Sequence, residues 1–247
     1  MLVGTFIKTP AVQVVELLGL AGLDFGVVDA EHGPFDRAAA DLMMVAGRAA
    51  GLDLFVRTAD RSATSVLWAL DIGAAGLVVP HVDSAQHAAE LVQAARFAGG
   101  ARGFSNSPRF GRYGASTIEE AMALGDRARI YAQIESAQAV AEAEAIIATP
   151  GLDGVVVGRA DLALSMGLTR PDAPEVMEAT RDVLALARSH GKAAIVVVGC
   201  AAEAGTFIAM GASHIIVGSD QSFLRASALA AASDIRALCP RHQEQQA

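Results

Sequence analysis

Cysteine is scarce in this chain, and the two present, Cys200 and Cys239, form neither a metal-binding CxxC motif nor a disulfide framework. We therefore expect a reducing, cytoplasmic location. No apolar run approaches the ~20 residues that cross a bilayer. The first residues, MLVGTFIKTP, lack the basic segment and long apolar run of a signal peptide. The sequence thus predicts neither a membrane span nor secretion.

Positive charge is also limited, because 19 Lys and Arg residues face 27 Asp and Glu residues, for a net charge of −8. The basic residues form no long run, so we expect neither nucleic acid nor a membrane surface as a partner. Lysine occurs only at Lys8 and Lys192. A Schiff-base enzyme needs a lysine in an apolar pocket. Lys8, at the end of the first predicted strand, is the one candidate.

Aromatic residues make up 5% of the chain and apolar residues 53%, a composition typical of Ala-rich helices packed on Val- and Ile-rich strands. Short apolar runs alternate with longer segments of helical periodicity, as in a parallel sheet covered on both faces. The predicted strands are 4–8, 25–30, 54–57, 76–80, 130–135, 154–158, 193–198 and 214–218. The predicted helices are 11–21, 36–50, 61–73, 84–98, 117–127, 136–148, 174–190, 203–211 and 221–238.

Eight strands, each followed by a helix, predict an α/β fold, a (β/α)8 TIM barrel formed by a single domain over residues 1–239. A polar tail is expected over 240–247. The alternative is an open doubly wound sheet, which the count of eight and the absence of GxGxxG after the first strand disfavour. The last helix, 221–238, carries apolar and small residues spaced to pack against another subunit, which predicts a homo-oligomer.

Polar residues follow several predicted strands directly, where barrel enzymes place their chemistry. The second strand ends in DAEH, with Asp29, Glu31 and His32; Arg57 ends the third strand; Gln133 and Glu135 end the fifth; and Asp161 follows the sixth. Each also has a structural interpretation. Asp29 suits a brace for the rim, Arg57 a partner for a rim carboxylate, and Glu135 and Asp161 suit helix amino termini, where the dipole favours acids.

The segment GTFIKTPAVQVVELLGLAGLDFGVVDAEHGPFD resembles the opening of the HpcH/HpaI aldolase/citrate lyase family, specifically its class II pyruvate aldolases. The similarity continues in order through FVRT at 55–58, residues 76–96, RGF at 102–104, QIES at 133–136 and GVVVGRADLALSMG at 154–167. It covers nearly the whole chain. The resemblance implies reversible cleavage of a 4-hydroxy-2-oxo acid to pyruvate and an aldehyde, oxaloacetate decarboxylation as a side activity, and a hexamer whose last helix packs on a neighbour.

The resemblance also assigns roles to individual residues. It implies that Glu135 and Asp161 hold a divalent cation, Mg, Mn or Co, and that Arg57 contacts the keto oxygen of pyruvate. It implies that His32 is the acid/base, oriented by Asp71. Asp29 is expected to support the site from its position at the end of the second strand. The substrate-binding residues expected from the resemblance are Arg57, Gln133, Gly158, Ala160 and Asp161, with backbone amides near the Ala160–Asp161 turn holding the carboxylate.

The chemistry agrees with this set, because a pyruvate aldolase without a Schiff base needs a metal to stabilise the enolate oxygen. Two carboxylates with bidentate pyruvate and waters make an octahedral oxygen site suited to Mg²⁺ or Mn²⁺. Histidine is the side chain that enzymes use most often for proton transfer, so His32 suits that role.

Two features leave alternatives open. Arg159 replaces the proline usual in the family, and it either brings a cation to the site or points away and pairs with an acid elsewhere. Arg102, Arg109 and Arg112 lie in the long irregular segment 99–116, where one of them either reaches the aldehyde end of the substrate or all are surface residues.

Three other functions compete with the aldolase. A citrate lyase β type CoA-ester lyase shares the fold and metal but needs basic groups for the CoA phosphates. A phosphate-sugar isomerase would need a Gly-rich phosphate site after the last two strands, where VVGC and VGSD offer one glycine each. A non-catalytic metabolite-binding barrel would not need to retain His32.

Overall fold

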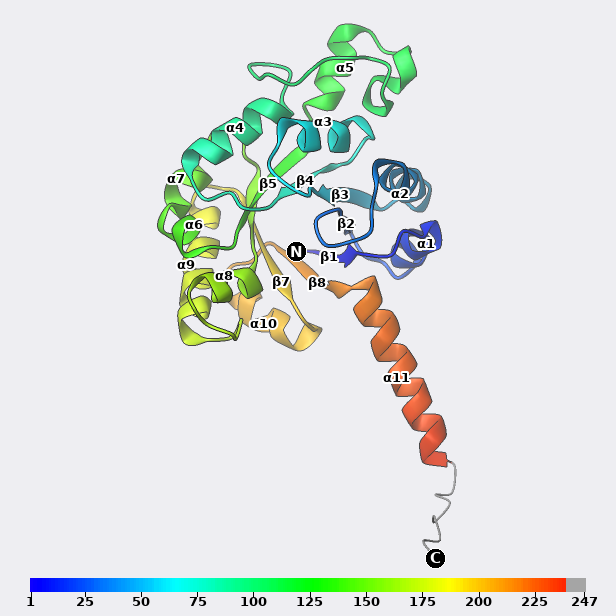
Figure 1. The fold of residues 1–247 in the computed structure, drawn as a ribbon, viewed down its shortest axis with the longest axis vertical. Helices are drawn as coiled ribbons and strands as arrows, with labels where there is room; N and C mark the ends of the chain where they lie inside the picture. Colours follow the sequence, from blue (N-terminus) through cyan, green and yellow to red (C-terminus); the bar gives the residue numbers. More distant parts are fainter. Residues whose placement is uncertain (239–247) are drawn as a thin grey trace, which may run out of the picture.

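The chain forms a closed barrel of eight parallel strands in the computed structural model, which describes residues 1–238 (Figure 1). Strands adjacent in sequence are adjacent in the barrel, and β1 closes it by pairing with β8. The strands are β1 (Leu2–Ile7), β2 (Phe25–Asp29), β3 (Asp53–Arg57), β4 (Gly76–Val79), β5 (Arg129–Ile134), β6 (Gly154–Val157), β7 (Ala193–Val198) and β8 (His214–Ser219). The predicted (β/α)8 barrel is confirmed, and the pairing of β1 with β8 rules out the open sheet.

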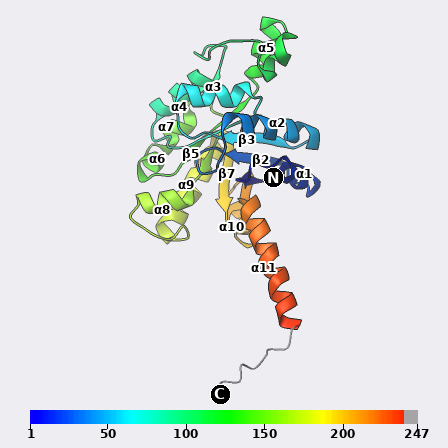
Figure 2. The same ribbon diagram turned by 45° about the vertical axis from the view of Figure 1, so that its right-hand side comes forward.

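Helices that follow the strands surround the barrel (Figures 1 and 2). They are α1 (Val12–Leu20), α2 (Arg37–Ala50), α3 (Ala63–Asp71), α4 (Ala85–Ala95), η1 (Arg109–Gly114), α5 (Ile118–Gly125), α6 (Ala137–Ala141), α7 (Ala143–Ala148), α8 (Arg159–Ser165), α9 (Pro174–Ser189), α10 (Ala201–Ala209) and α11 (Asp220–Leu238). Apart from α11, the longer helices bury apolar faces against the barrel, as the helical periodicity predicts. None of the helices within residues 1–238 is both long and apolar enough to cross a membrane.

Three helical features differ from the prediction. The segment expected as one helix over 136–148 is divided at Glu142, whose φ of −97° and ψ of 5° leave the helical region. Two short elements, α8 and the 3-10 turn η1, were not predicted. The apolar periodicity of 136–148 continues across Glu142, so the sequence pattern does not reveal the break there. In α8 and η1, which have seven and six residues, the periodicity is too weak to predict a helix.

Alternate side chains of each strand fill the barrel interior. Phe25, Phe55 and Tyr131 pack together toward its amino-terminal end, with ring centroids 5.8 Å apart for Phe25 and Phe55 and 5.3 Å apart for Phe55 and Tyr131. Side chains two and four positions further along a strand point to the same face. Asp29 on β2 and Arg57 on β3 therefore also face the interior, above the aromatic layer. The barrel thus presents polar groups at its carboxyl-terminal mouth.

The last helix, α11, projects away from the barrel instead of lying against it (Figures 1 and 2). Its main contacts within the chain are with β1 and β8. Large apolar side chains along it are exposed, namely Leu224, Leu229, Ile235 and Leu238. The projecting helix is where the sequence predicted an extra element, whereas the polar tail expected over 240–247 lies outside the described residues.

Candidate active site

Asp29, the last residue of β2, is the centre of the polar cluster at the mouth. Its side chain is fully buried, and its carboxylate accepts hydrogen bonds from Arg57 Nε at 2.9 Å and Nη2 at 2.7 Å, while Lys8 Nζ lies 2.7 Å away. Burial raises the pKa of Asp29, but the hydrogen bond and charge of Arg57, together with the bond from Lys8, outweigh burial and lower the pKa to about 2. Asp29 is therefore ionised at neutral pH and anchors two cations.

The turn after β2 presents Glu31 and His32 beside this cluster. Their backbone N–H groups donate to Asp29 Oδ1 at 3.3 and 3.1 Å, which fixes the turn. Glu31 Oε2 lies 3.3 Å from Arg57 Nε, yet it is buried without a hydrogen-bond partner among the described residues. Burial is the largest cause of the raised pKa of Glu31, and the Glu135 carboxylate raises it further. The His32 ring is 57% exposed at the rim, with Nε2 3.9 Å from Glu31 Oε2.

Glu135 follows β5 and is buried, with both carboxylate oxygens held. Oε1 accepts a hydrogen bond from the His81 N–H at 2.7 Å, and Oε2 accepts one from the side-chain amide of Gln133. Gly158 makes this arrangement possible, because a Cβ there would lie 3.0 Å from Glu135 Cβ and 3.1 Å from Oε2. The oxygen of the Gln133 side-chain amide, Oε1, is buried and has no hydrogen-bond partner in the described part of the chain.

His81 bridges the two glutamates at the mouth. Its Nδ1 lies 3.1 Å from Glu135 Oε1, and its Nε2 lies 3.4 Å from Glu31 Oε1. The backbone of His81 has a φ of 56°, in the left-handed region that side chains other than glycine rarely adopt. Such strain costs on the order of 1–3 kcal/mol and is concentrated at functional sites. The contacts with both carboxylates oppose that strain, and the exposed ring faces the mouth.

A cavity of about 300 Å³ opens beside the cluster. Its lining comprises Phe6, Arg57, Gln133, Gly158, Arg159, Ala160, Asp161, Pro171, Val197, Val198, Gly199 and Gly218. Asp161 is exposed in the first turn of α8, which begins directly after Gly158. All five residues predicted to bind substrate, Arg57, Gln133, Gly158, Ala160 and Asp161, therefore line one cavity.

Arg159 lies at the edge of this cavity but its charge is used elsewhere. Its guanidinium packs over the Phe207 ring at 4.4 Å, donates to the carbonyl oxygen of Val197 and pairs with Glu203 at 2.6 Å. Two roles were open for Arg159, which replaces the proline usual in the family: a cation at the site, or a partner for an acid elsewhere. The structure shows the latter, because Arg159 pairs with Glu203 away from the cluster.

Asp71 is not brought to His32 within the chain. It ends α3, a few residues before β4 starts, so it lies toward the amino-terminal end of the barrel, whereas His32 follows the carboxyl end of β2. Its carboxylate accepts a hydrogen bond from Arg102 Nη2 at 2.8 Å. Arg102 is itself buried between the rings of Phe97 and Phe110, at 4.4 and 4.6 Å. Arg102 is therefore committed to this contact and not to the aldehyde end of a substrate.

Two residues that sequence reasoning passed over belong to the site. Sequence alone assigns Lys8 only a candidate Schiff-base role. Its position directly after β1, like that of Arg57 at the end of β3, already indicated a side chain at the barrel mouth. His81 directly follows Pro80 after β4, and this position after a strand was the available indication. Its left-handed backbone, which turns it toward Glu135, has no sequence indication.

The oxygen donors here fit a small divalent cation. The carboxylates of Glu135 and Asp161 follow neighbouring strands, and the unpartnered Gln133 Oε1 is a further buried oxygen nearby. Oxygen ligands are those that Mg²⁺ and Mn²⁺ prefer. No group of three or more His, Cys, Asp or Glu side chains in residues 1–238 is arranged to hold a metal. The fit therefore requires that substrate and water oxygens complete the coordination.

Comparison with known proteins gives consistent matches. The chain matches the sequence profile of the HpcH/HpaI aldolase/citrate lyase family over residues 2–227. It is 36% identical over 215 residues to a 5-keto-4-deoxy-D-glucarate aldolase from Klebsiella pneumoniae subsp. pneumoniae, a match that covers 86% of this chain and 83% of that protein. A crystal structure of a HpcH/HpaI aldolase/citrate lyase family protein from Burkholderia cenocepacia J2315 superposes with a TM-score of 0.91 at 32% identity, covering 95% of this chain and 94% of that one. A HpcH/HpaI aldolase from Desulfitobacterium hafniense DCB-2 gives a TM-score of 0.90 at 27% identity, with 97% and 94% covered.

Proposed function

Since the chain belongs to the HpcH/HpaI aldolase/citrate lyase family, we propose that it is a class II, divalent-metal-dependent aldolase, a carbon–carbon lyase. It cleaves a 4-hydroxy-2-oxo acid reversibly into pyruvate and an aldehyde. The observation that carries this proposal is the cluster of Asp29, Arg57 and Glu135 beside a cavity that Asp161 lines. The cluster supplies fixed positive charge, carboxylates and a nearby imidazole on one side of a small cavity.

The carboxylates of Glu135 and Asp161 would hold the cation, and Gln133 would orient Glu135 through its amide N–H. When bound, a divalent cation supplies positive charge that stabilises the negative charge developing on the keto oxygen of the substrate. Gly158 leaves the space next to Glu135 free, so the carboxylate can be approached from the cavity.

Arg57 would stabilise the same oxygen from a second direction. Two of its nitrogens donate to Asp29, and its guanidinium lies over the Phe6 ring at 4.6 Å, so its orientation is fixed before substrate binds. Charge that is already oriented needs no reorganisation during the reaction, which is the usual origin of a large electrostatic contribution to catalysis.

His32 is the group best placed to move the proton. In cleavage it accepts the proton of the C4 hydroxyl while the C3–C4 bond breaks and the aldehyde forms. The bonding electrons pass to C3, which then takes up a proton to give pyruvate. In the reverse direction His32 returns its proton to the aldehyde oxygen. Its exposed ring at the rim can reach a bound ligand, and the hydrogen bond from its N–H to Asp29 fixes the segment that carries it.

The substrate that we propose is a sugar-derived hydroxy-oxo acid. The named relative acts on 5-keto-4-deoxy-D-glucarate, a sugar acid. The side chain of His81 is exposed at the mouth and that of Lys8 is partly exposed, so both can meet hydroxyl groups on the aldehyde half of such a substrate. Oxaloacetate decarboxylation is an expected side activity, because it generates the same charge on pyruvate.

The site features weigh against the rival functions. Lys8, Arg57 and Arg159 at the mouth are each paired with a carboxylate, so CoA phosphates would find no free cation among them. After β7 and β8, the N–H of Gly199 donates to Glu203 and that of Ser219 donates to Ser222, instead of being free for a phosphate. A Schiff base at Lys8 would first require breaking its ion pair with the fully buried Asp29.

We also propose that the chain works as a homo-oligomer, with a hexamer as the expected form. The exposed apolar side chains of α11 support this, as does an apolar groove of about 660 Å³ between α1 and α2, where Leu17 and Leu20 are exposed. A second copy of the chain would cover both surfaces. The thiol of Cys200 is exposed and forms no disulfide within residues 1–238, which supports a reducing, cytoplasmic location.

The proposed function is tested by incubating the full chain with Mg²⁺ and either 5-keto-4-deoxy-D-glucarate or malyl-CoA. Pyruvate is measured in the first reaction, and acetyl-CoA and glyoxylate, the products of carbon–carbon cleavage of malyl-CoA, are measured in the second. We expect pyruvate from the sugar acid and no acetyl-CoA from malyl-CoA. Acetyl-CoA formation without pyruvate formation would instead assign the chain to the CoA-ester lyases of the same fold.

A further inference from the structure

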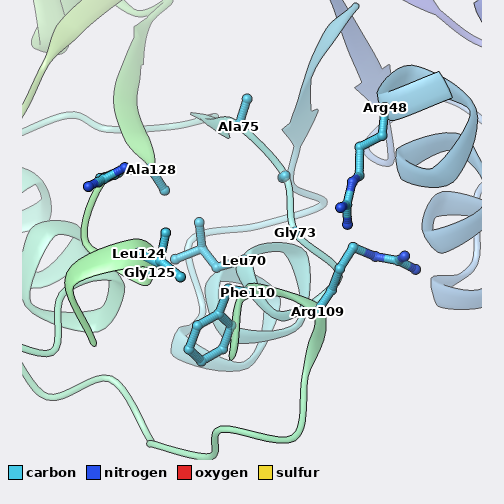
Figure 3. Close-up of a pocket in the computed structure, with 11 residues that line it drawn as sticks. Arg48, Leu70, Gly73, Ala75, Arg109, Phe110, Leu124, Gly125 and Ala128 are labelled. Atoms are coloured by element: carbon cyan, nitrogen blue, oxygen red, sulfur yellow. The ribbon is translucent and has the colours of Figure 1, made fainter. Parts of the chain in front are cut away.

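A separate cavity of about 260 Å³ lies at the amino-terminal end of the barrel, away from the mouth. Its lining, drawn in Figure 3, comprises Arg48, Leu70, Gly73, Ala74, Ala75, Arg109, Phe110, Leu124, Gly125, Arg127 and Ala128. Gly73–Ala75 directly precede β4, and Arg127 and Ala128 directly precede β5, which fixes the location at the end of the barrel opposite to His32 and Glu135. The cavity is therefore not an extension of the candidate active site.

The charged side chains that line this cavity are all arginines. Three arginines line it, Arg48 from the end of α2, Arg109 from η1 and Arg127 from the turn before β5, and none of the lining residues is acidic. Arg109 pairs with Asp41, outside the lining, whereas the side chains of Arg48 and Arg127 have no hydrogen-bond or ion-pair partner in residues 1–238. Two uncompensated cations around one hollow are unexpected in a chain with a net charge of −8.

The rest of the lining is apolar. Leu70, Phe110 and Leu124 provide hydrocarbon and aromatic surface, and Figure 3 shows Arg48 extending from α2 toward Gly73 and Arg109. A neighbouring cavity of about 470 Å³ shares Arg48, Gly73 and Ala75 with the first one. Arg48 thus lies between two hollows, where its guanidinium can meet a ligand that enters either of them.

The wall that carries Arg109 is rigidly held. Arg109 Nε donates to the carbonyl oxygen of Ile72 at 2.8 Å, and its side chain packs against Gly73, where a Cβ would lie 2.8 Å from Arg109 Cδ. Arg112 and Tyr113, which follow in η1, have φ angles of 53° and 57°. Consecutive left-handed residues of this type are strained and are found at ligand clamps and switches. The fold therefore tolerates local backbone strain in η1, which keeps η1 beside the cavity.

We propose that this cavity binds a small organic anion, a carboxylate or phosphate group attached to an apolar body. The acidic group would pair with Arg48 and Arg127, since a guanidinium matches both anions with two parallel N–H donors. The apolar body would lie on Leu70, Phe110 and Leu124. This site is independent of the proposed aldolase function, because none of its lining residues contributes to the cluster at the mouth.

Isothermal titration of the full chain with benzoate and with inorganic phosphate tests the proposal. Benzoate carries both required groups, and phosphate carries the charge alone, so benzoate should bind more tightly. The titration is repeated in an Arg57→Gln background, which removes a charged side chain that lines the cavity at the mouth. Arg48→Gln is the test variant and Arg181→Gln, an exposed arginine of α9, is the matched control.

Benzoate binding should weaken at least tenfold in Arg48→Gln, a change of ~1.4 kcal/mol, and should weaken further in Arg48→Gln with Arg127→Gln. Arg57→Gln and Arg181→Gln should leave it unchanged. Because Arg48 is exposed and bonds to nothing in the described chain, its variant should fold, which circular dichroism checks. Binding that survives Arg48→Gln, that is lost in Arg57→Gln, or that is undetectable in the unmodified chain at millimolar benzoate would each overturn the proposal.

Discussion

Asp29 and Arg57 are register partners on β2 and β3, and they share two hydrogen bonds of 2.9 and 2.7 Å inside the barrel mouth. Lys8 pairs with the same carboxylate from β1, on the other side of β2. One buried anion thus fixes two cations from two neighbouring strands. The orientation of Arg57 toward the cavity, and with it the proposed stabilisation of the keto oxygen, depends on this arrangement.

Asp29→Asn should destabilise the fold. The substitution removes the carboxylate but leaves Lys8 and the buried Arg57 charged, and breaking a buried pair by removing one partner costs about 3–5 kcal/mol. Urea unfolding at pH 7 and fixed protein concentration measures the change. Asp172→Asn, which breaks an exposed pair with Arg170, is the control and should change the unfolding free energy much less. A loss no greater than that of the control would contradict the assigned role of Asp29.

The effect of Asp29→Asn should also depend on pH. The pKa of Asp29 is about 2 in the fold and 3.8 is its ordinary value, so ionised Asp29 stabilises the folded state. This stabilisation is complete above pH ~4 and is lost as the pH falls through about 2. The difference in unfolding free energy between the unmodified chain and the variant should therefore shrink over that window. A difference independent of pH from 5 to 2 would mean that the ion pairs do not stabilise the fold.

Gly158→Ala should weaken metal binding. The added Cβ would lie 3.0–3.1 Å from Glu135, so the carboxylate must move. Displacing a metal ligand or its support typically lowers metal affinity about 10–100-fold. Mn²⁺ titration followed by electron paramagnetic resonance measures the affinity. Gly205→Ala on α10, where a Cβ meets nothing within 4 Å, is the control. Equal Mn²⁺ affinity in both variants would show that Glu135 does not bind the metal.

His32→Ala and Arg57→Ala should separate proton transfer from charge stabilisation. His32→Ala should lower kcat on the order of 10²–10⁴-fold, the range for a lost acid/base, with little change in metal or pyruvate affinity. Arg57→Ala should impair both pyruvate binding and turnover, because it acts in the ground and transition states alike. Steady-state cleavage beside pyruvate proton exchange distinguishes them. If His32→Ala cleaves the substrate at the same rate as the unmodified chain, the role of the DAEH segment is structural and not catalytic.

The predictable part of the site consists of side chains at strand ends. Asp29, Arg57 and Gln133 sit in strands whose apolar pattern is clear, and the alternation along a strand then fixes which face they occupy. Gly158 and Asp161 were predicted from the position of the sixth strand and from the resemblance. For these residues, the apolar pattern of the strand and the barrel topology together determine where the side chain lies.

The remaining features depend on contacts that sequence pattern does not encode. Asp71 pairs with Arg102 because the long segment after α4 folds back on the end of α3, and a loop of that length has no periodicity to predict it. His81 reaches Glu135 because its backbone adopts a left-handed conformation, which histidine rarely does. Arg159 turns to Glu203, an acid in a helix 44 residues further along the chain.

Lys8→Met should retain metal-dependent activity, although with reduced stability from the loss of its pair with Asp29. Borohydride added with pyruvate should leave the unmodified chain active, because no Schiff base forms for it to reduce. Mass spectrometry after this treatment measures any covalent pyruvate adduct. An adduct on Lys8, abolished by Lys8→Met, would replace the metal-dependent mechanism with a Schiff-base mechanism.

Metal dependence of pyruvate activation is the central claim, and it can be measured without knowing the aldehyde. Exchange of the pyruvate methyl protons with D₂O is followed by proton NMR in the presence of the full chain with Mg²⁺ or Mn²⁺, with excess EDTA, and after the metal is restored. Exchange should proceed with metal, stop with EDTA and return on restoration, and Glu135→Gln should not exchange under any of these conditions. Exchange at the full rate in excess EDTA would contradict the account.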